Sequence, residues 1–316
     1  MAANSTNELS EEGRSGRSWR ALALLLILLA AAWAFRPALS GPFIFDDFPN
    51  LENLRHLNEG VSQASIRQYL GSVRGNPGRP LAMLSFLIED AAWPAYPADY
   101  KRNNLLFHLL AGLLVLCLTL RLVALTDLPG VAKRWAPLAC TAAWLCNPMQ
   151  LSATMLVVQR MNILASIFVL VGLLAYLRIV LSRRAPATLQ VMLAGASLGL
   201  FGGLAFLCKE NGILIFAYAT ALNCTLLRSS LEHYPRAARL LLLLGAAAPL
   251  LALAIAAAAQ PDALLEAYKI RDFTLLERVL TQPRILFDYL GNILVPRLGG
   301  QGILHDDYLI SRSLTD

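Results

Sequence analysis

The sequence predicts an all-α, polytopic membrane helix bundle of about seven spans, with short amphipathic helices on the extracytoplasmic side. Of its 316 residues, 57% are hydrophobic and only 15% are charged, and the mean hydropathy of +0.54 exceeds that of ordinary soluble proteins. The apolar residues also gather in runs close to the roughly 20 residues that a helix needs to cross a hydrocarbon core of about 30 Å. Membrane lipids are therefore the first expected partners of this chain.

Seven apolar segments follow one another along the chain, each closed by charged or turn residues, and none repeats another. They cover residues 21–39, 103–124, 136–155, 161–181, 188–207, 212–227 and 237–258. They divide the chain into a tail over 1–20, a membrane domain over 21–258 with a long loop over 40–102, and a last segment over 259–316. That last segment mixes charged and apolar residues at helical spacing, which indicates helices lying at the outer surface.

Basic residues predict the orientation, because Lys and Arg in short loops mark the cytoplasmic side. They occur in the N-terminal tail and in every second connection: Arg14, Arg17, Arg20, Arg121, Lys133, Arg134, Arg178, Arg183, Arg184, Arg228, Arg236 and Arg239. We therefore predict a cytoplasmic N-terminus. A cleaved signal peptide over residues 14–40 is the competing interpretation. The alternation of basic loops disfavours it, because that alternation requires the first span.

Several other classes of protein and site find no support in the sequence. The net charge of +6 does not indicate a nucleic-acid partner, because the basic residues lie in short loops between apolar runs. The cysteines lie in or beside those runs without metal-ligand spacing, at Cys117, Cys140, Cys146, Cys208 and Cys224. Because the sequence has no Gly-rich phosphate loop or Ser/His/Asp pattern, we expect no nucleotide cofactor. A divalent cation stays open, since the "HDDY" stretch, residues 305–308, could bind metal or form an exposed turn.

The predicted extracytoplasmic face carries the unusual charged residues of the chain. An acidic pair follows the first span in "GPFIFDDFPNLENL", and cations follow in "GNPGRPL", "NPMQLSATMLVVQRMN" and "CKENG". Ionisable residues at membrane depth cost about 2.5 to 3.5 kcal/mol each and are therefore functional candidates. The candidates are Asp46, Asp47, Arg79, Arg160, Lys209 and Glu210.

Group transfer at that face would need a carboxylate base and cations that hold an anionic leaving group. Asp46 or Asp47 could serve as the base. The cations would be Arg79, Arg160 and Lys209. If the backbone is extended at the acidic pair, neighbouring side chains point opposite ways, so only one aspartate need face the reaction. Low-dielectric surroundings and the second carboxylate would raise the pKa of that aspartate and make it a better base.

Four of these candidates also have a structural alternative. Asp47 could cap a helix that begins near Pro49. Arg79 could anchor a helix end at the lipid head groups. Lys209 and Glu210 could form a local ion pair in a tight turn. Their joint position on one face of the membrane favours a functional interpretation.

Five stretches of the chain carry a family resemblance. They are "FIFDDFPNL", "GRPLAMLSF", "NNLLFHLLAGLLV", "NPMQLSATMLVVQRMNILA" and "CKENGIL", within residues 43–215. In this order they resemble motifs of the transmembrane and tetratricopeptide-repeat O-glycosyltransferases and related bacterial proteins. That group falls within the GT-C superfamily of multi-spanning glycosyltransferases.

The resemblance implies a polyprenyl-phosphate sugar donor in the membrane and a protein or glycan acceptor that arrives from outside the cytoplasm. It also implies inversion at the anomeric centre, with an acidic residue of the first loop as base, which falls on Asp46 or Asp47. The substrate site would include Arg79, Arg160, Lys209 and Glu210, the three cations being expected at the lipid phosphate. Relatives with short tails are bacterial, so the resemblance implies a bacterial inner membrane and a periplasmic active face. An endoplasmic reticulum membrane stays open as the alternative.

The resemblance adds one more candidate residue, His108, and the chain departs from the family pattern at two points. His108 falls in its "N..LH" segment and could hydrogen-bond the sugar or a partner on the first span, or simply pack inside the bundle. Asn147 stands before Pro148 where relatives usually have His-Pro, so the role of that imidazole does not transfer. Relatives also continue through further spans, so we expect either a short family member or a fragment.

Two alternatives from other classes stay open at this point. A transporter would also place polar residues between spans, but it predicts inverted repeats and helices broken at mid-membrane. A non-enzymatic membrane assembly subunit would tolerate loss of Asp46 and Asp47. The span pattern fits all three functions.

Overall fold

The computed structural model describes residues 2–71, 79–89, 91–182, 184–260, 265–266, 268–269, 271–295 and 308–313. Every regular element in these ranges is a helix, and none of them contains a strand, which confirms the all-α prediction. Three expectations fall outside these ranges, namely the basic Arg183, the start of "GNPGRPL" at residues 75–78, and the alternative metal ligands at residues 305–307.

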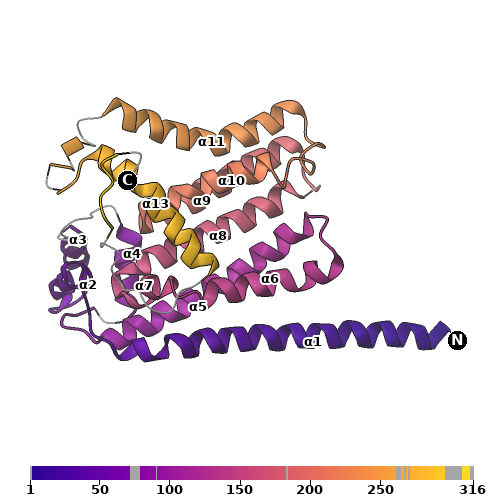
Figure 1. Cartoon of the computed structure of the whole chain (residues 1–316), viewed down its shortest axis with the longest axis horizontal. Helices are drawn as coiled ribbons and strands as arrows, with labels where there is room; N and C mark the ends of the chain where they lie inside the picture. Colours follow the sequence, from indigo (N-terminus) through magenta and orange to yellow (C-terminus); the bar gives the residue numbers. More distant parts are fainter. Residues whose placement is uncertain are drawn as a thin grey trace.

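Five helices in the described part of the chain are long and apolar enough to cross a membrane. They cover Ser18–Ser40 (the end of α1, Ala2–Phe35, and η1, Arg36–Ser40), Pro97–Ala124 (α5), Val157–Val180 (η4, Val157–Gln159, and α8, Arg160–Val180), Ala187–Cys208 (α9) and Arg236–Ala259 (α11). In Figure 1 they run roughly along one direction. The protein is therefore an integral membrane protein.

The other two apolar segments form shorter helices, so the predicted seven spans are not confirmed. Segment 136–155 divides into α6 (Gly130–Leu145, 16 residues) and α7 (Gln150–Met155). The division falls at Asn147, whose side-chain oxygen accepts the Met149 N–H at 2.9 Å in a local turn that competes with helix. Segment 212–227 forms α10 (Leu214–Cys224, 11 residues). At 1.5 Å per residue these helices measure about 24 and about 16 Å, less than a hydrocarbon core.

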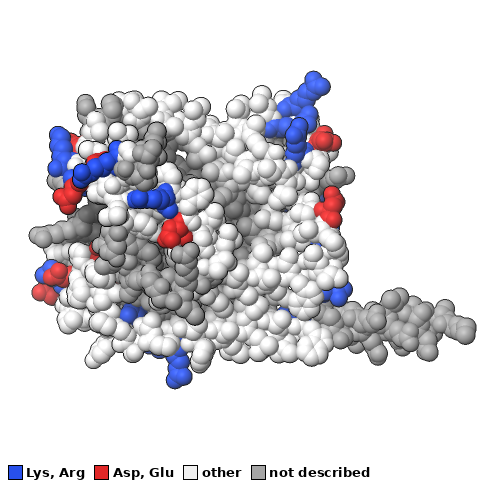
Figure 2. Space-filling model, viewed as in Figure 1, with Lys and Arg blue, Asp and Glu red and all other residues white. Residues whose placement is uncertain are grey.

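The two ends of the bundle differ in the segments that they carry (Figure 1). The N-terminus and the connections α5–α6, α8–α9 and α10–α11 lie at one end, which we call the basic end because of its arginines and lysines. The opposite, short-helix end carries α2 (Asp47–Leu51), η2 (Glu52–Leu57), α3 (Gln63–Gly71), α4 (Pro80–Ser85) and η3 (Phe86–Ile88). On the face drawn in Figure 2, charged side chains gather toward these ends and the band between them is mostly uncharged.

The core of the bundle is built around α8 and α9. Their most apolar windows are 39% and 33% buried, against 11% for the windows in α1 and α11, which therefore lie at the periphery. Gly172 of α8 permits close packing, because a Cβ there would meet the Phe201 Cβ of α9 at 2.7 Å. Small residues at such contacts let membrane helices approach closely.

The last segment forms α13 (Leu275–Leu294), which begins with a capping box between Thr274 and Glu277. In Figure 1 it crosses the bundle obliquely from the short-helix end. The Ile293 carbonyl accepts the Asn147 side-chain N–H at 3.1 Å, so α13 is tied to the break between α6 and α7.

Candidate functional site

The acidic pair lies in a sharp turn between η1 and α2. Phe45, just before it, has a φ of +49°, a left-handed conformation that costs a non-glycine residue roughly 1–2 kcal/mol. After this turn Asp46 is exposed, whereas Asp47 is 0% exposed. The two carboxylates are therefore separated as expected, although the backbone at Asp46 is helical (φ −65°, ψ −10°) and not extended.

Asp47 ties the first loop to η4, the short helix directly before α8. Its Oδ1 accepts the Val158 N–H at 2.8 Å, and its Oδ2 accepts the Ile44 N–H at 3.2 Å. Burial raises the pKa of this carboxyl, while these hydrogen bonds and the nearby Lys101 oppose the shift. The helix-cap alternative is wrong, because α2 begins at Asp47 itself and has no side-chain cap.

Lys101, in the first turns of α5, supports this turn and was missed by sequence reasoning. It is 4% exposed, and its Nζ donates to the carbonyls of Gly41 at 3.0 Å and Ala38 at 3.3 Å. A Cβ at Gly41 would lie 2.9 Å from this Nζ, so glycine leaves room for the ammonium group. A lysine at the start of a predicted span was the signal that could have found it.

Lys209 is the charged residue that brings the other candidates together. It follows the end of α9 in extended conformation (φ −161°, ψ 146°) and is half-buried. Burial and the neighbouring Arg79 lower the pKa of Lys209, while the negative charges of Glu210 and Asp46 act in the opposite direction. The structure thus places Asp46, from the first loop, within electrostatic reach of Lys209 in the fifth motif, which in turn adjoins Arg79 of the second motif.

Arg79 and Glu210 form a two-pronged ion pair across 131 positions of sequence. The Arg79 Nε lies 3.0 Å from Glu210 Oε1, and its Nη2 lies 2.7 Å from Oε2. The hydrogen bonds from Arg79 lower the pKa of Glu210. The Arg79 side chain is 18% exposed and that of Glu210 is 49% exposed, so this pair is open to solvent on one side. The predicted partner of Glu210 was Lys209, but its ion pair is with Arg79.

Arg160 lies in a different environment, fully buried beneath the site. Its Nε donates to Asn104 Oδ1 at 2.6 Å, and its Nη1 and Nη2 donate to both carboxylate oxygens of Glu89. The carbonyls of Ser85 and Tyr100, each at 3.0 Å, receive its two other N–H groups. All five guanidinium donors are therefore used inside the protein. This geometry favours a positioning role for Arg160 over the expected contact with a lipid phosphate.

Glu89 completes that pair and was missed, since it follows α4 and η3 in a loop without a recognised motif. Its side chain is 2% exposed, and it also accepts the Asn103 side-chain N–H at 2.9 Å. The asparagines of the third motif thus fix the buried ion pair: Asn103 holds the glutamate, and Asn104 holds the arginine.

His108 occupies a packing position between helices. It is 1% exposed, its ring stacks on Trp144 at 4.9 Å, and its Nε2 lies 3.0 Å from the Leu145 carbonyl oxygen. The Phe35 ring of α1 lies 5.2 Å away, so the contact with the first span is an aromatic one. Of the expectations for His108, the structure shows this packing role.

Uncharged polar side chains connect Lys209 with Asn211, which is exposed at the start of η5. The Lys209 Nζ donates to Gln159 Oε1 at 3.3 Å, Gln159 also accepts from Asn162, and Asn162 accepts from Asn211 at 3.4 Å. We call these residues the polar relay. Gln159, Asn162 and Asn211 lie inside the fourth and fifth motifs. Sequence reasoning selected only the charged residues of these motifs and therefore missed the three neutral side chains.

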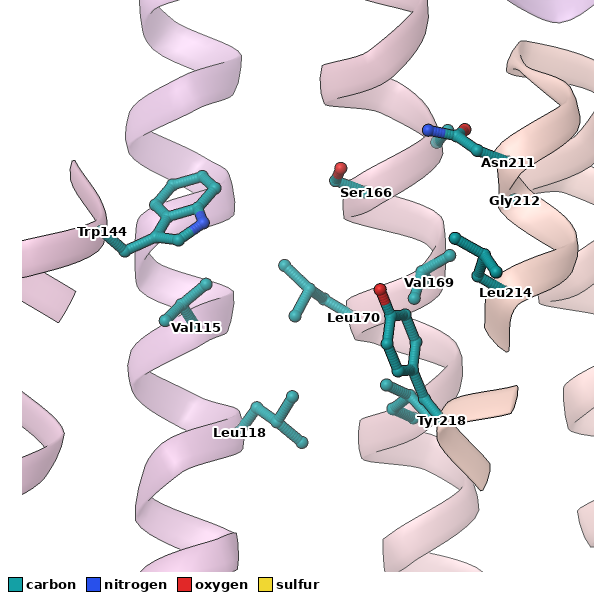
Figure 3. Close-up of a pocket in the computed structure, with 12 residues that line it drawn as sticks. Val115, Leu118, Trp144, Ser166, Val169, Leu170, Asn211, Gly212, Leu214 and Tyr218 are labelled. Atoms are coloured by element: carbon teal, nitrogen blue, oxygen red, sulfur yellow. The ribbon is translucent and has the colours of Figure 1, made fainter. Parts of the chain in front are cut away.

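An apolar groove begins where the polar relay ends. It has a volume of ≈ 300 Å³ and lies between α5, α6, α8 and α10. Figure 3 shows Trp144 and Val115 on one wall, Leu170 and Tyr218 on the other, and Asn211 at the upper end. The groove therefore joins an apolar, membrane-level space to the charged residues of the short-helix end.

No protein-family model, curated protein or solved structure matches this chain. The site is therefore interpreted from its own geometry. Within the described ranges no group of three or more His, Cys, Asp or Glu side chains is placed to hold a metal ion.

Proposed function

We propose that this protein is a membrane glycosyltransferase that moves a sugar from a polyprenyl-phosphate donor to a protein or glycan acceptor, with inversion. The observation that carries the proposal is the connection of an apolar groove, through the polar relay, to Lys209 and the exposed Asp46. A lipid-linked sugar has the same order of parts: an apolar chain, an anionic phosphate and a polar sugar.

The donor would enter with its chain in the groove and its phosphate near Lys209. The groove walls are largely aliphatic and aromatic, which suits a prenyl chain. Arg79, held by Glu210, supplies a second positive charge beside Lys209. Cations placed where negative charge develops stabilise the departing phosphate.

Asp46 is the base in this proposal, and Asp47 positions it. The exposed Asp46 carboxylate accepts a proton from the acceptor while the acceptor atom attacks the anomeric carbon. The bond from that carbon to the phosphate oxygen breaks, and the phosphate leaves with the electron pair. Asp47 is buried against the Val158 and Ile44 N–H groups and fixes the turn that presents Asp46.

Transfer activity of membranes containing this chain, read as sugar mass added to an acceptor, tests the proposal. We expect Asp46→Asn to lower the rate by about 10²- to 10⁴-fold, because a general base is lost. Glu52→Gln is the matched control, since Glu52 is another exposed acid of the same loop, paired with Arg55. Equal transfer by Asp46→Asn and Glu52→Gln, at equal protein levels, would overturn the proposed mechanism.

The proposed location is a bacterial inner membrane, with the N-terminus in the cytoplasm and the short-helix end in the periplasm. The distribution of basic residues supports this orientation, because the basic connections lie at the same end as the N-terminus (Figure 1). The acceptor would then reach Asp46 from the periplasmic side.

A further inference from the structure

A second pocket lies at the basic end of the bundle, away from the proposed active site. It has a volume of ≈ 280 Å³ and is lined by Arg121, Leu177, Arg178, Leu181, Ser182 and Arg184. Arg121 comes from the last turn of α5 and Arg178 from the last turn of α8. Three arginines from two segments, the end of α5 and the region from the end of α8 into the α8–α9 connection, therefore converge on one hollow.

The charge of this pocket has no counter-ion in the protein as described. Its lining contains three guanidinium groups and no carboxylate. Among the residues that the structure describes, none of these arginines takes part in an ion pair. The helix dipole and the orientation rule explain each arginine separately, but neither requires the three to share a pocket.

The position of the pocket indicates the kind of anion that would fill it. Two candidate spans end beside it, at Ala124 and Val180, which places it at head-group depth. Its floor is apolar, since Leu177 is 1% exposed and Leu181 adjoins it. A phosphate at the arginines would leave acyl chains lying along the apolar helix surfaces. Basic pockets between membrane helices bind anionic lipid head groups in this way.

We propose that the pocket formed by Arg121, Arg178 and Arg184 binds the phosphate of an anionic phospholipid. This site is independent of the proposed transferase reaction, because it lies at the opposite end of the bundle and its occupancy is measured without a sugar donor.

Binding of phosphatidylglycerol to the purified full chain in mild detergent, followed by native mass spectrometry, tests the site. Phosphatidylcholine with the same acyl chains is the neutral reference. We expect the triple variant Arg121→Gln, Arg178→Gln, Arg184→Gln to weaken phosphatidylglycerol binding by about a hundredfold and to leave phosphatidylcholine unaffected.

A charge-matched control removes three cations from the same end outside the pocket: Lys133→Gln, Arg134→Gln, Arg236→Gln. We expect at most about a threefold loss in this control, because none of these three side chains lines the pocket and salt weakens their longer-range attraction for the head group. Equal losses in the two triple variants would show a general surface effect and overturn the site. Displacement of the lipid by equimolar inorganic phosphate would show a soluble-anion site and overturn the lipid assignment. Equal melting temperatures without lipid would establish that the variants fold alike.

Discussion

Two arginine–glutamate pairs, both with two-pronged geometry, lie near the same end of this membrane bundle and differ in what surrounds them. Arg160 and Glu89 have side chains that are 0% and 2% exposed, and protein groups occupy all five donors of the arginine. The side chains of Arg79 and Glu210 are 18% and 49% exposed and adjoin the half-buried Lys209. Of the two arginines predicted to act on substrate, only Arg79 therefore keeps an accessible position, whereas Arg160 is fully used inside the protein.

The buried pair gives the largest expected effect on stability. Arg160→Leu leaves the Glu89 carboxylate buried without its cation, so we expect a loss of about 3–5 kcal/mol in the free energy of unfolding. Thermal unfolding in detergent measures it. The double variant Arg160→Leu, Glu89→Leu removes both charges and should recover much of the loss. A double variant as unstable as the single one would contradict the assignment of Arg160 to a buried ion pair.

Replacing Lys209, the accessible cation, should have the next largest effect, and that effect is on transfer activity. Lys209→Met should lower sugar transfer by about 10²- to 10³-fold, because a preorganised cation near the leaving phosphate is lost. The melting temperature should change little, since the half-buried ammonium makes one 3.3 Å hydrogen bond to Gln159. Lys269→Met, at a 72%-exposed side chain, is the matched control. Equal rates in both variants would exclude Lys209 from the reaction.

The open pair should contribute much less to stability than the buried one. We expect Glu210→Gln to lower the free energy of unfolding by at most about 1 kcal/mol, because water screens a partly exposed ion pair. The same unfolding assay as for Arg160→Leu allows a direct comparison. A loss as large as that of Arg160→Leu would show that the two pairs have the same role, against the distinction drawn from their exposure.

The smallest expected effects are on the pH dependence of stability. They have opposite signs for the carboxyls of Glu210 and Asp47. The folded-state pKa of Glu210 is lowered from 4.5, so its stabilisation is present above pH 4.5 and is lost as the pH falls through the lowered value. The pKa of Asp47 is raised from 3.8, so the folded state binds the extra proton and stability decreases as the pH rises from 3.8 to the raised value. Melting curves of Glu210→Gln and Asp47→Asn between about pH 2 and pH 7 should each lose one of these slopes. An unchanged profile in either variant would refute the shift for that residue.

Sequence patterns predicted the helical class, the membrane location and five of the seven apolar segments as full-length spans. These properties depend on the length and polarity of local runs, which can be read without knowing what packs against what. The same reasoning overestimated the length of the helices around Asn147 and after Gly212. There a local turn and an early helix end shorten the helices while composition stays apolar.

Local sequence is enough to establish that apolar helices form, that basic residues alternate between connections, and that charged residues follow the ends of apolar runs. The packing of the helices settles which aspartate is buried, that Arg160 pairs with Glu89, and that Arg79 pairs with Glu210. These choices depend on contacts across 71 and 131 positions of chain, and on a left-handed residue at Phe45. Hydropathy and periodicity are local quantities, whereas the burial and pairing of a charge depend on segments that meet only when the helices pack.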